Sequence, residues 1–191
     1  GYETSKWMGK CPECMKWNSF VEEIEEKKTK KEVFIIDKSS SQPVSINSIV
    51  AVKEERFTTD IEELDRVLGG GIVKGSLVLV GGDPGIGKST LLLQVANEYT
   101  TYGEVIYISG EESPAQVKNR GERLNIKSKN LFLMSETDIS RIYEYLVSKK
   151  PKVVIVDSIQ TLYNSVVDSI PGTPTQIREC TLKIIELAKK Y

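Results

Sequence analysis

The chain has 191 residues, 39% hydrophobic and 28% charged, a composition typical of one globular domain with a small appendage. Its 26 basic and 27 acidic residues give a net charge of -1, so no global positive field indicates a nucleic-acid partner. Without histidine, a Ser-His-Asp triad or a His-ligated metal site is excluded. No apolar run approaches the roughly 20 residues of a membrane helix, and no secretory signal is recognisable. We therefore expect a cytoplasmic protein without a membrane segment.

The first 20 residues predict a small metal-binding knuckle. Cys11 and Cys14 have the Cys-x-x-Cys spacing of a zinc site. Because tetrahedral structural zinc takes four ligands and the only other thiol is Cys180, a complete zinc site cannot be built from this chain alone. A thioredoxin-like redox pair is the alternative, and it is disfavoured because the pair lies outside any predicted strand–helix unit. Cys180 itself is predicted to be a buried small hydrophobe.

Residues 21–45 predict a charged and polar linker. Most residues from 21 to 32 are charged, with acids first and lysines after, and a Ser-rich stretch ending in Gln-Pro follows. A short exposed helix with Glu-to-Lys pairs is an equal alternative. Neither a linker nor an exposed helix here would contribute catalytic or binding residues.

A globular pattern begins near residue 46, and strands and helices then alternate. Thr59 and Glu62 fit a capping box for a first helix, which a run of three glycines at 69–71 would end. The predicted strands are residues 76–81, 104–109, 130–134 and 152–157. The predicted helices are residues 88–99, 114–124 capped by Ser113, 138–149 and 175–190. This alternation predicts an α/β fold with a mostly parallel sheet flanked by helices.

Residues 82–89 match the P-loop pattern G-x-x-x-x-G-K-[ST], between a predicted strand and a predicted helix. Glycines let backbone N–H groups face phosphate oxygens, Lys88 reaches the β and γ phosphates, and Ser89 offers a hydroxyl to Mg²⁺. A glycine turn without a ligand is the alternative, which the flanking elements disfavour. The residues assigned to ATP and its metal are Gly82, Asp83, Pro84, Gly85, Ile86, Gly87, Lys88, Ser89, Thr90 and Asp157.

Three carboxylates complete the predicted site. Asp157 ends an apolar strand, where parallel sheets bind their ligands, and would hold Mg²⁺ through water opposite Ser89. Glu111 and Glu112 follow the strand at 104–109 and can orient the attacking water. The structural alternatives are a turn or cap role for Asp157 and stabilisation of the next helix dipole by the glutamates. The predicted catalytic residues are Glu111, Glu112 and Lys88.

Several strings of the sequence converge on one family. They are residues 6–14, 68–73, the P-loop, 109–113, 157–161 and 171–173. Together they resemble the RadA (Sms) family of bacterial DNA repair proteins, which are RecA-like ATPases. The resemblance covers essentially the whole chain and is weakest in the linker. Each motif is shared with other RecA-like ATPases, but the knuckle before the ATPase is specific to this family.

The resemblance implies a four-cysteine zinc finger, a RecA-like ATPase core, a Lys-Asn-Arg-Phe-Gly motif and a Lon-protease-like C-terminal domain. The chain departs from this plan at both ends, so we expect a fragment. We divide it into a partial zinc finger with only the second Cys-x-x-Cys (1–20), the linker (21–45) and the N-terminal part of the ATPase domain, with an incomplete core (46–191). The string at 118–121 echoes the five-residue motif by coincidence, because it lacks the phenylalanine.

The activity that the resemblance implies is ATP hydrolysis coupled to single-stranded DNA binding and branch migration. It implies a hexameric ring that cooperates with the RecA recombinase on branched DNA, with ATP and Mg²⁺ as cofactors and Zn²⁺ in the intact protein. From this segment alone we expect weak or no hydrolysis, because RecA-like sites are usually completed across a subunit interface. The alternative is an ATP-switched ring-assembly module without motor activity. A small-molecule kinase is disfavoured because Glu111 and Glu112 occupy a hydrolytic position.

Overall fold

The structure of the chain, a computed structural model, describes residues 9–17, 43–48 and 55–191. The chain divides into two compact units, Gly1–Ala51 and Val52–Tyr191. In the first unit, Lys10 and Trp17 form an antiparallel bridge, and a single turn of 3-10 helix, η2, spans Ile46–Ser48. Most of the predicted linker and the outer parts of the predicted knuckle lie outside the described residues.

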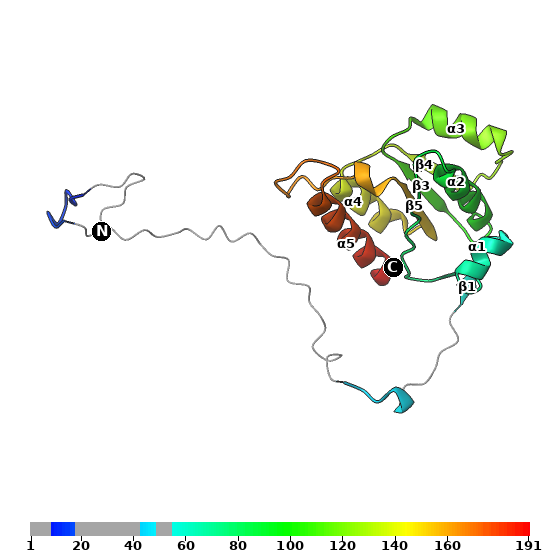
Figure 1. The fold of residues 1–191 in the computed structure, drawn as a ribbon, viewed down its shortest axis with the longest axis horizontal. Helices are drawn as coiled ribbons and strands as arrows, with labels where there is room; N and C mark the ends of the chain where they lie inside the picture. Colours follow the sequence, from blue (N-terminus) through cyan, green and yellow to red (C-terminus); the bar gives the residue numbers. More distant parts are fainter. Residues whose placement is uncertain (1–8, 18–42, 49–54) are drawn as a thin grey trace. The chain divides into compact units, whose positions relative to one another are not determined.

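The second unit is built on a sheet of three parallel strands in the order β4-β3-β5 (Figure 1). The strands are β3 (Val105–Ser109), β4 (Leu131–Met134) and β5 (Val153–Asp157). The register pairs Tyr107 with Ile155 and Ser109 with Asp157. The carboxyl ends of β3 and β5 therefore finish side by side, at the edge where parallel sheets bind ligands.

Two hydrophobic cores lie on opposite faces of this sheet, because successive side chains of a strand point to opposite sides. Val105 and Tyr107 of β3 pack with α2 (Lys88–Tyr99) and α3 (Pro114–Arg123). Ile106 and Ile108 pack on the other face with α4 (Ile139–Lys149) and α5 (Pro174–Lys190). All five residues of β3 are buried, which confirms the predicted parallel sheet with helices on both faces.

The second core also contains Cys180, whose side chain is fully buried. Burial raises the pKa of the Cys180 thiol above its usual value, so the thiol stays protonated and packs as a small hydrophobe. The sequence prediction for this residue is confirmed.

The predicted helices and three of the four predicted strands form, with ends shifted by at most one residue. Ser113 caps α3 in a complete capping box with Gln116, and Asp138 caps α4 through the amide of Ser140. A short 3-10 helix, η3 (Ile159–Thr161), follows β5. Within the described residues, none of the helices has both the length and the apolar character that crossing a membrane requires.

The predicted capping box of Thr59 and Glu62 is wrong. The first helix, α1 (Glu62–Val67), has Ile61 as its N-cap, without a side-chain cap. Thr59 is fully buried, and its amide and hydroxyl both donate to the Asp65 carboxylate at 2.8 Å. Asp65 lies one turn inside the helix and offers a charged acceptor, so it outcompetes the cap. A two-stranded antiparallel sheet of β1 (Arg56–Phe57) and β2 (Ile72–Val73), which the sequence did not predict, brackets this helix.

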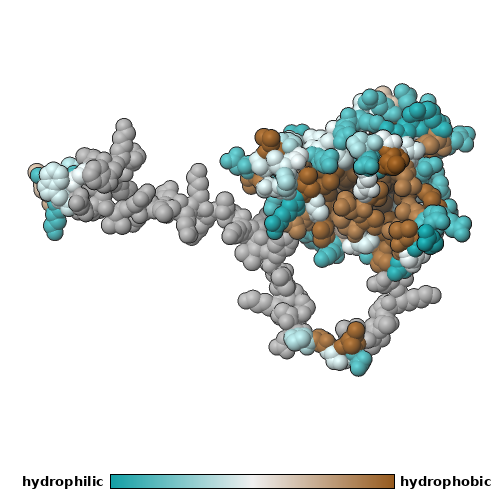
Figure 2. All heavy atoms as spheres, viewed as in Figure 1, coloured by the Kyte–Doolittle hydropathy of each residue, from teal (hydrophilic) through white to brown (hydrophobic). Residues whose placement is uncertain are grey.

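The predicted strand at residues 76–81 is also wrong. Within the described residues, no sheet includes this segment, and Leu77, Val78 and Leu79 are 43%, 42% and 80% exposed. An apolar run becomes a strand only where a neighbouring strand takes its backbone hydrogen bonds, and β5 bonds to β3 alone. Hydrophobic residues gather over a broad area of the face of this unit that Figure 2 shows.

A buried glutamine fastens the loop between η3 and α5. The Gln176 side chain, 1% exposed, accepts from the amide of Asn164 at 2.8 Å and donates to three carbonyls. These belong to Asn164, Val167 and Ser169, at 3.2, 3.3 and 2.8 Å. One side chain therefore bonds to four backbone groups of this loop.

We expect Gln176→Leu to lower the free energy of unfolding by about 3 kcal/mol, because the loop's buried backbone groups lose their partner. Urea unfolding measures this change. The control is Gln94→Leu, at an exposed position of α2, which should change stability by less than about 0.5 kcal/mol. Equal stability of the two variants would contradict the role given to Gln176.

Candidate functional site

The loop of residues 82–87 joins the exposed apolar segment to α2. Gly85 and Gly87 have φ angles of +79° and +105°, in the left-handed region that glycine adopts without strain. Gly87 is the N-cap of α2 and gives it no side-chain cap. The first N–H groups of α2 therefore keep the positive end of the helix dipole available to an anion.

Lys88 lies back across this loop. Its ammonium donates to the carbonyls of Gly82 and Asp83, both at 2.8 Å. Ser89 is half-buried in the first turn of α2, and Thr90 beside it is exposed. The remaining residues assigned to the nucleotide by sequence, Asp83, Pro84 and Ile86, are exposed on the loop. The structure thus brings a lysine, a hydroxyl and free helix N–H groups to one place.

Asp157 is the last residue of β5, as predicted. Its carboxylate accepts a hydrogen bond from the hydroxyl of Tyr107, with 2.6 Å between Tyr107 Oη and Asp157 Oδ2. The α2 helix packs against both β3 and β5, and the register places Asp157 beside Ser109 at the end of β3. An oxygen pair such as the Ser89 hydroxyl and the Asp157 carboxylate suits Mg²⁺, which prefers oxygen ligands.

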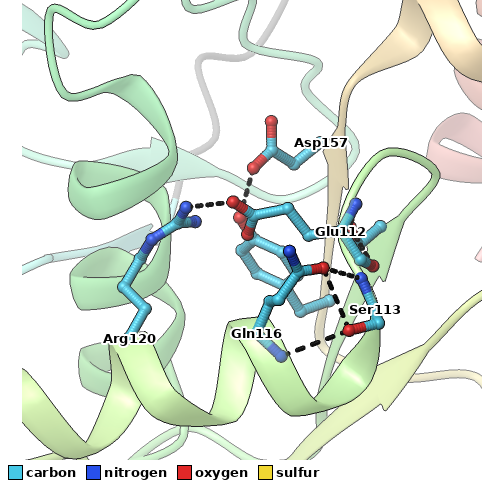
Figure 3. Close-up of polar contacts among 7 residues, drawn as sticks. Glu112, Ser113, Gln116, Arg120 and Asp157 are labelled. Carbon is cyan, nitrogen blue, oxygen red and sulfur yellow. Dashed lines mark hydrogen bonds and ion pairs between the residues drawn. The ribbon is translucent and has the colours of Figure 1, made fainter.

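Glu111 and Glu112 follow β3 but have different partners. Glu111 is exposed, and its carboxylate accepts from the Ser158 hydroxyl at 2.9 Å. Glu112 extends toward α3 and forms an ion pair with Arg120 (Figure 3). The side chains of Arg120 and Glu112 are only 18% and 31% exposed. Glu111 is therefore open to solvent and linked to the end of β5, whereas Glu112 is held by a cation.

The turn that carries both glutamates is fixed by Ser109 and Gly110. The Ser109 hydroxyl donates to the Glu112 carbonyl at 3.0 Å and accepts from the Glu112 amide at 3.1 Å. Gly110 lies against η3, so that an added Cβ would overlap both Oγ1 and Cβ of Thr161. The close packing of Gly110 on Thr161 therefore sets where Glu111 lies.

We expect Gly110→Ala to lower stability by about 1 to 3 kcal/mol and to displace Glu111, because the new methyl group overlaps Thr161. The matched control is Gly121→Ala in α3, where the added Cβ meets its nearest atoms at 3.8 and 4.0 Å. That change should stabilise the protein by about 0.5 to 1 kcal/mol, because alanine favours a helix interior. Thermal unfolding of both variants compares them, and a neutral Gly110→Ala would contradict the close contact.

Three polar residues of this site were missed by sequence reasoning: Tyr107, Arg120 and Ser158. Tyr107 interrupts an otherwise aliphatic buried strand, which is a signal that its hydroxyl needs a polar partner. Arg120 lies two helical turns after the Ser113 cap. It belongs to residues 118–121, whose likeness to the Lys-Asn-Arg-Phe-Gly motif we treat as a coincidence. Which carboxylates these residues would meet depends on the pairing of β3 with β5 and the packing of α3.

The two cysteines of the knuckle lie in a tight turn of the first unit. The Cys11 amide donates to the Lys16 carbonyl at 3.1 Å, and the Met15 amide donates to the Cys11 carbonyl at 2.9 Å. Cys11 is buried and Cys14 is exposed. Among the described residues no three potential ligands gather around one point, so the assignment of Cys11 and Cys14 to zinc stays a prediction.

One family model matches a part of each unit. The ATPase family described as KaiC matches residues 57–137, a range that holds the P-loop and both glutamates. The zinc-ribbon family described as rubredoxin metal binding domain matches residues 1–22.

Full-length relatives align with nearly the whole chain. DNA repair protein RadA of Listeria monocytogenes is 50% identical over 190 residues, which is 99% of this chain and 42% of that protein. DNA repair protein RadA of Bacillus subtilis is 49% identical over 193 residues, and that of Campylobacter jejuni is 47% identical over 193 residues. The chain thus spans 42 to 43% of the length of these relatives. Over the segment that it shares with them, the chain belongs to the RadA family of RecA-like P-loop ATPases.

Proposed function

We propose that this chain carries the ATP-binding and ATP-hydrolysing site of a cytoplasmic DNA repair protein. The observation that carries the proposal is a P-loop at the start of α2 together with carboxylates at the ends of two neighbouring parallel strands. The P-loop precedes α2, Asp157 ends β5, and Glu111 and Glu112 follow β3. The names of the relatives, which are DNA repair proteins, support the biological role.

In this proposal the loop of residues 82–87 and the start of α2 bind the phosphates through backbone N–H groups. Lys88 exchanges its two carbonyl partners for the β and γ phosphate oxygens, a stronger charge-assisted contact. Ser89 and Asp157 hold Mg²⁺, directly and through water, and Thr90 follows Ser89 in the first turn of α2. Bound Mg²⁺ would neutralise charge that develops on the phosphate oxygens.

Hydrolysis requires attack of a water oxygen on the γ phosphorus while the bond to the β–γ bridging oxygen breaks, which yields ADP and phosphate. A carboxylate must orient this water and accept its proton. We propose Glu111 as that base, because its exposed carboxylate accepts only a hydroxyl hydrogen bond among the contacts described above. Glu112 is held by its ion pair with Arg120 and stabilises the turn that carries Glu111.

For the whole protein we propose a hexameric ring that binds single-stranded and branched DNA and promotes branch migration together with the RecA recombinase. An ATP-switched ring-assembly module without motor activity is the competing proposal. Both use the same ATP site, so they differ only in whether DNA changes the rate of hydrolysis.

We also propose that residues 1–20 are part of a zinc finger, with Cys11 and Cys14 as two ligands of Zn²⁺, that residues 21–45 are a linker, and that residues 46–191 are the N-terminal part of the ATPase domain. The match of residues 1–22 to a rubredoxin-type zinc ribbon supports the first assignment. The exposed apolar run at 77–79 supports the last, because such a run suits a strand interior to a larger sheet.

The test is the ATPase rate of the full-length protein with and without single-stranded DNA, beside its Lys88→Ala variant. A Lys88-dependent rate that rises with DNA is the result that we expect of a motor. A Lys88-dependent rate indifferent to DNA would favour the switch. A rate that does not depend on Lys88 would overturn the ATP site itself.

A further inference from the structure

Tyr107 is a fully buried residue whose hydroxyl points at the site. It is 0% exposed in the core between the sheet and α2. The register pairs Tyr107 with Ile155 and Ser109 with Asp157, so Tyr107 and Asp157 are diagonal neighbours on the same face of the sheet. That diagonal is within the reach of a tyrosine, and the 2.6 Å contact with Asp157 Oδ2 results.

The direction of this hydrogen bond follows from the chemistry of its partners. The phenolic hydroxyl of Tyr107 carries the hydrogen and donates it, and the Asp157 carboxylate accepts. A donor held in a packed core restricts rotation of the Asp157 carboxylate and leaves Oδ1 as its other oxygen.

A charged pair lies next to this contact (Figure 3). Arg120 of α3 and Glu112 of the turn before it form an ion pair. Glu112 Oε2 and Arg120 Nη1 are buried and have no hydrogen-bond partner among the described residues. Glu112 thus pairs with Arg120, whereas Asp157 receives the hydroxyl hydrogen of Tyr107.

We propose that Tyr107 is a positioning residue that holds the Asp157 carboxylate in the orientation in which it receives magnesium-bound water. This inference rests on the proposed function, because it needs Asp157 to serve MgATP. Tyr107 touches neither nucleotide nor metal and acts only through Asp157. Groups that orient a metal-binding side chain from behind change metal affinity about 10- to 100-fold when they are removed.

The test is Tyr107→Phe in the full-length protein, which keeps the ring in the core and deletes the hydroxyl. Binding of a fluorescent ATP analogue is titrated with Mg²⁺, and the ATPase rate is measured over the same Mg²⁺ range. We expect the half-saturating Mg²⁺ concentration to rise about 10-fold, with the turnover number at saturating Mg²⁺ within about 2-fold of wild type. A tyrosine with only a structural role would not raise the half-saturating Mg²⁺ concentration while leaving the turnover number unchanged.

The matched control is Tyr99→Phe. Tyr99 is also 0% exposed in the same core, and its hydroxyl donates to the Phe57 carbonyl at 3.2 Å, away from Asp157. The control loses the same kind of buried hydrogen bond and should keep the wild-type Mg²⁺ dependence. Thermal unfolding without nucleotide compares the folding of the two variants.

A double-mutant cycle with Asp157→Asn supplies the second measurement. If Tyr107 acts through Asp157, Tyr107→Phe has no further effect on the Mg²⁺ titration once Asp157 is changed. Independent, additive effects would overturn the inference, and so would an unshifted titration for Tyr107→Phe alone. If the wild type itself binds the analogue without any dependence on Mg²⁺, the proposed function fails, and the inference with it.

Discussion

Lys88→Ala is expected to lower the affinity for ATP about 100-fold or more and so to abolish productive binding. The ammonium would contribute at least two charge-assisted hydrogen bonds to phosphate oxygens, each worth roughly 1.5 to 3 kcal/mol. The fold should not suffer, because the two carbonyls that Lys88 contacts belong to exposed residues of the loop and water can replace the ammonium.

Isothermal titration with ATP and Mg²⁺ measures this effect, and thermal unfolding checks the fold. Lys118→Ala is the matched control, because Lys118 is an exposed lysine of α3 that pairs with Glu122 at 3.5 Å. Its loss should leave ATP binding unchanged. An affinity of Lys88→Ala close to that of the control would remove the P-loop from the proposal.

Glu111→Gln is expected to preserve ATP binding and to slow turnover about 100- to 10,000-fold, the range for loss of a general base. The amide can still accept from the Ser158 hydroxyl, so the local structure should hold. Stability should change little, because the carboxylate is exposed. Single-turnover hydrolysis of labelled ATP, alongside equilibrium binding, separates the two steps.

Glu112→Gln should differ from this pattern. It removes the charge that balances Arg120, whose side chain is only 18% exposed, and so should lower stability by roughly 1 to 2 kcal/mol. A glutamine variant that turns over slowly and keeps its stability identifies the general base. A variant that turns over slowly and is also less stable identifies a glutamate that holds the structure of the turn. Normal turnover in both glutamine variants would remove these carboxylates from the mechanism.

Local signals predict much of this fold. The cap of α3 depends on Ser113 and Gln116, three residues apart, and the P-loop glycines adopt φ angles that few other residues tolerate. These features need no distant partner, so the sequence pattern predicts them. The strand predicted at 76–81 failed because strands, unlike helices, need hydrogen-bond partners from elsewhere in the chain.

The contacts that distinguish the site residues are not local. Tyr107 and Asp157 are 50 positions apart in the chain, and only the register of β3 with β5 brings them together. The sequence pattern likewise identified Glu111 and Glu112 but did not separate them. Their difference arises from Arg120 and Ser158, which approach from α3 and from the end of β5.

The four hydrogen bonds of Gln176 join the loop at 164–169 to the first turn of α5. Because these bonds join both ends of the loop to one side chain of α5, we expect the loop and the start of α5 to open together. The amide of Asn164 should therefore exchange its hydrogen with solvent at the same rate as the first turns of α5. A displacement of the first turn of α5 should then move this loop with it.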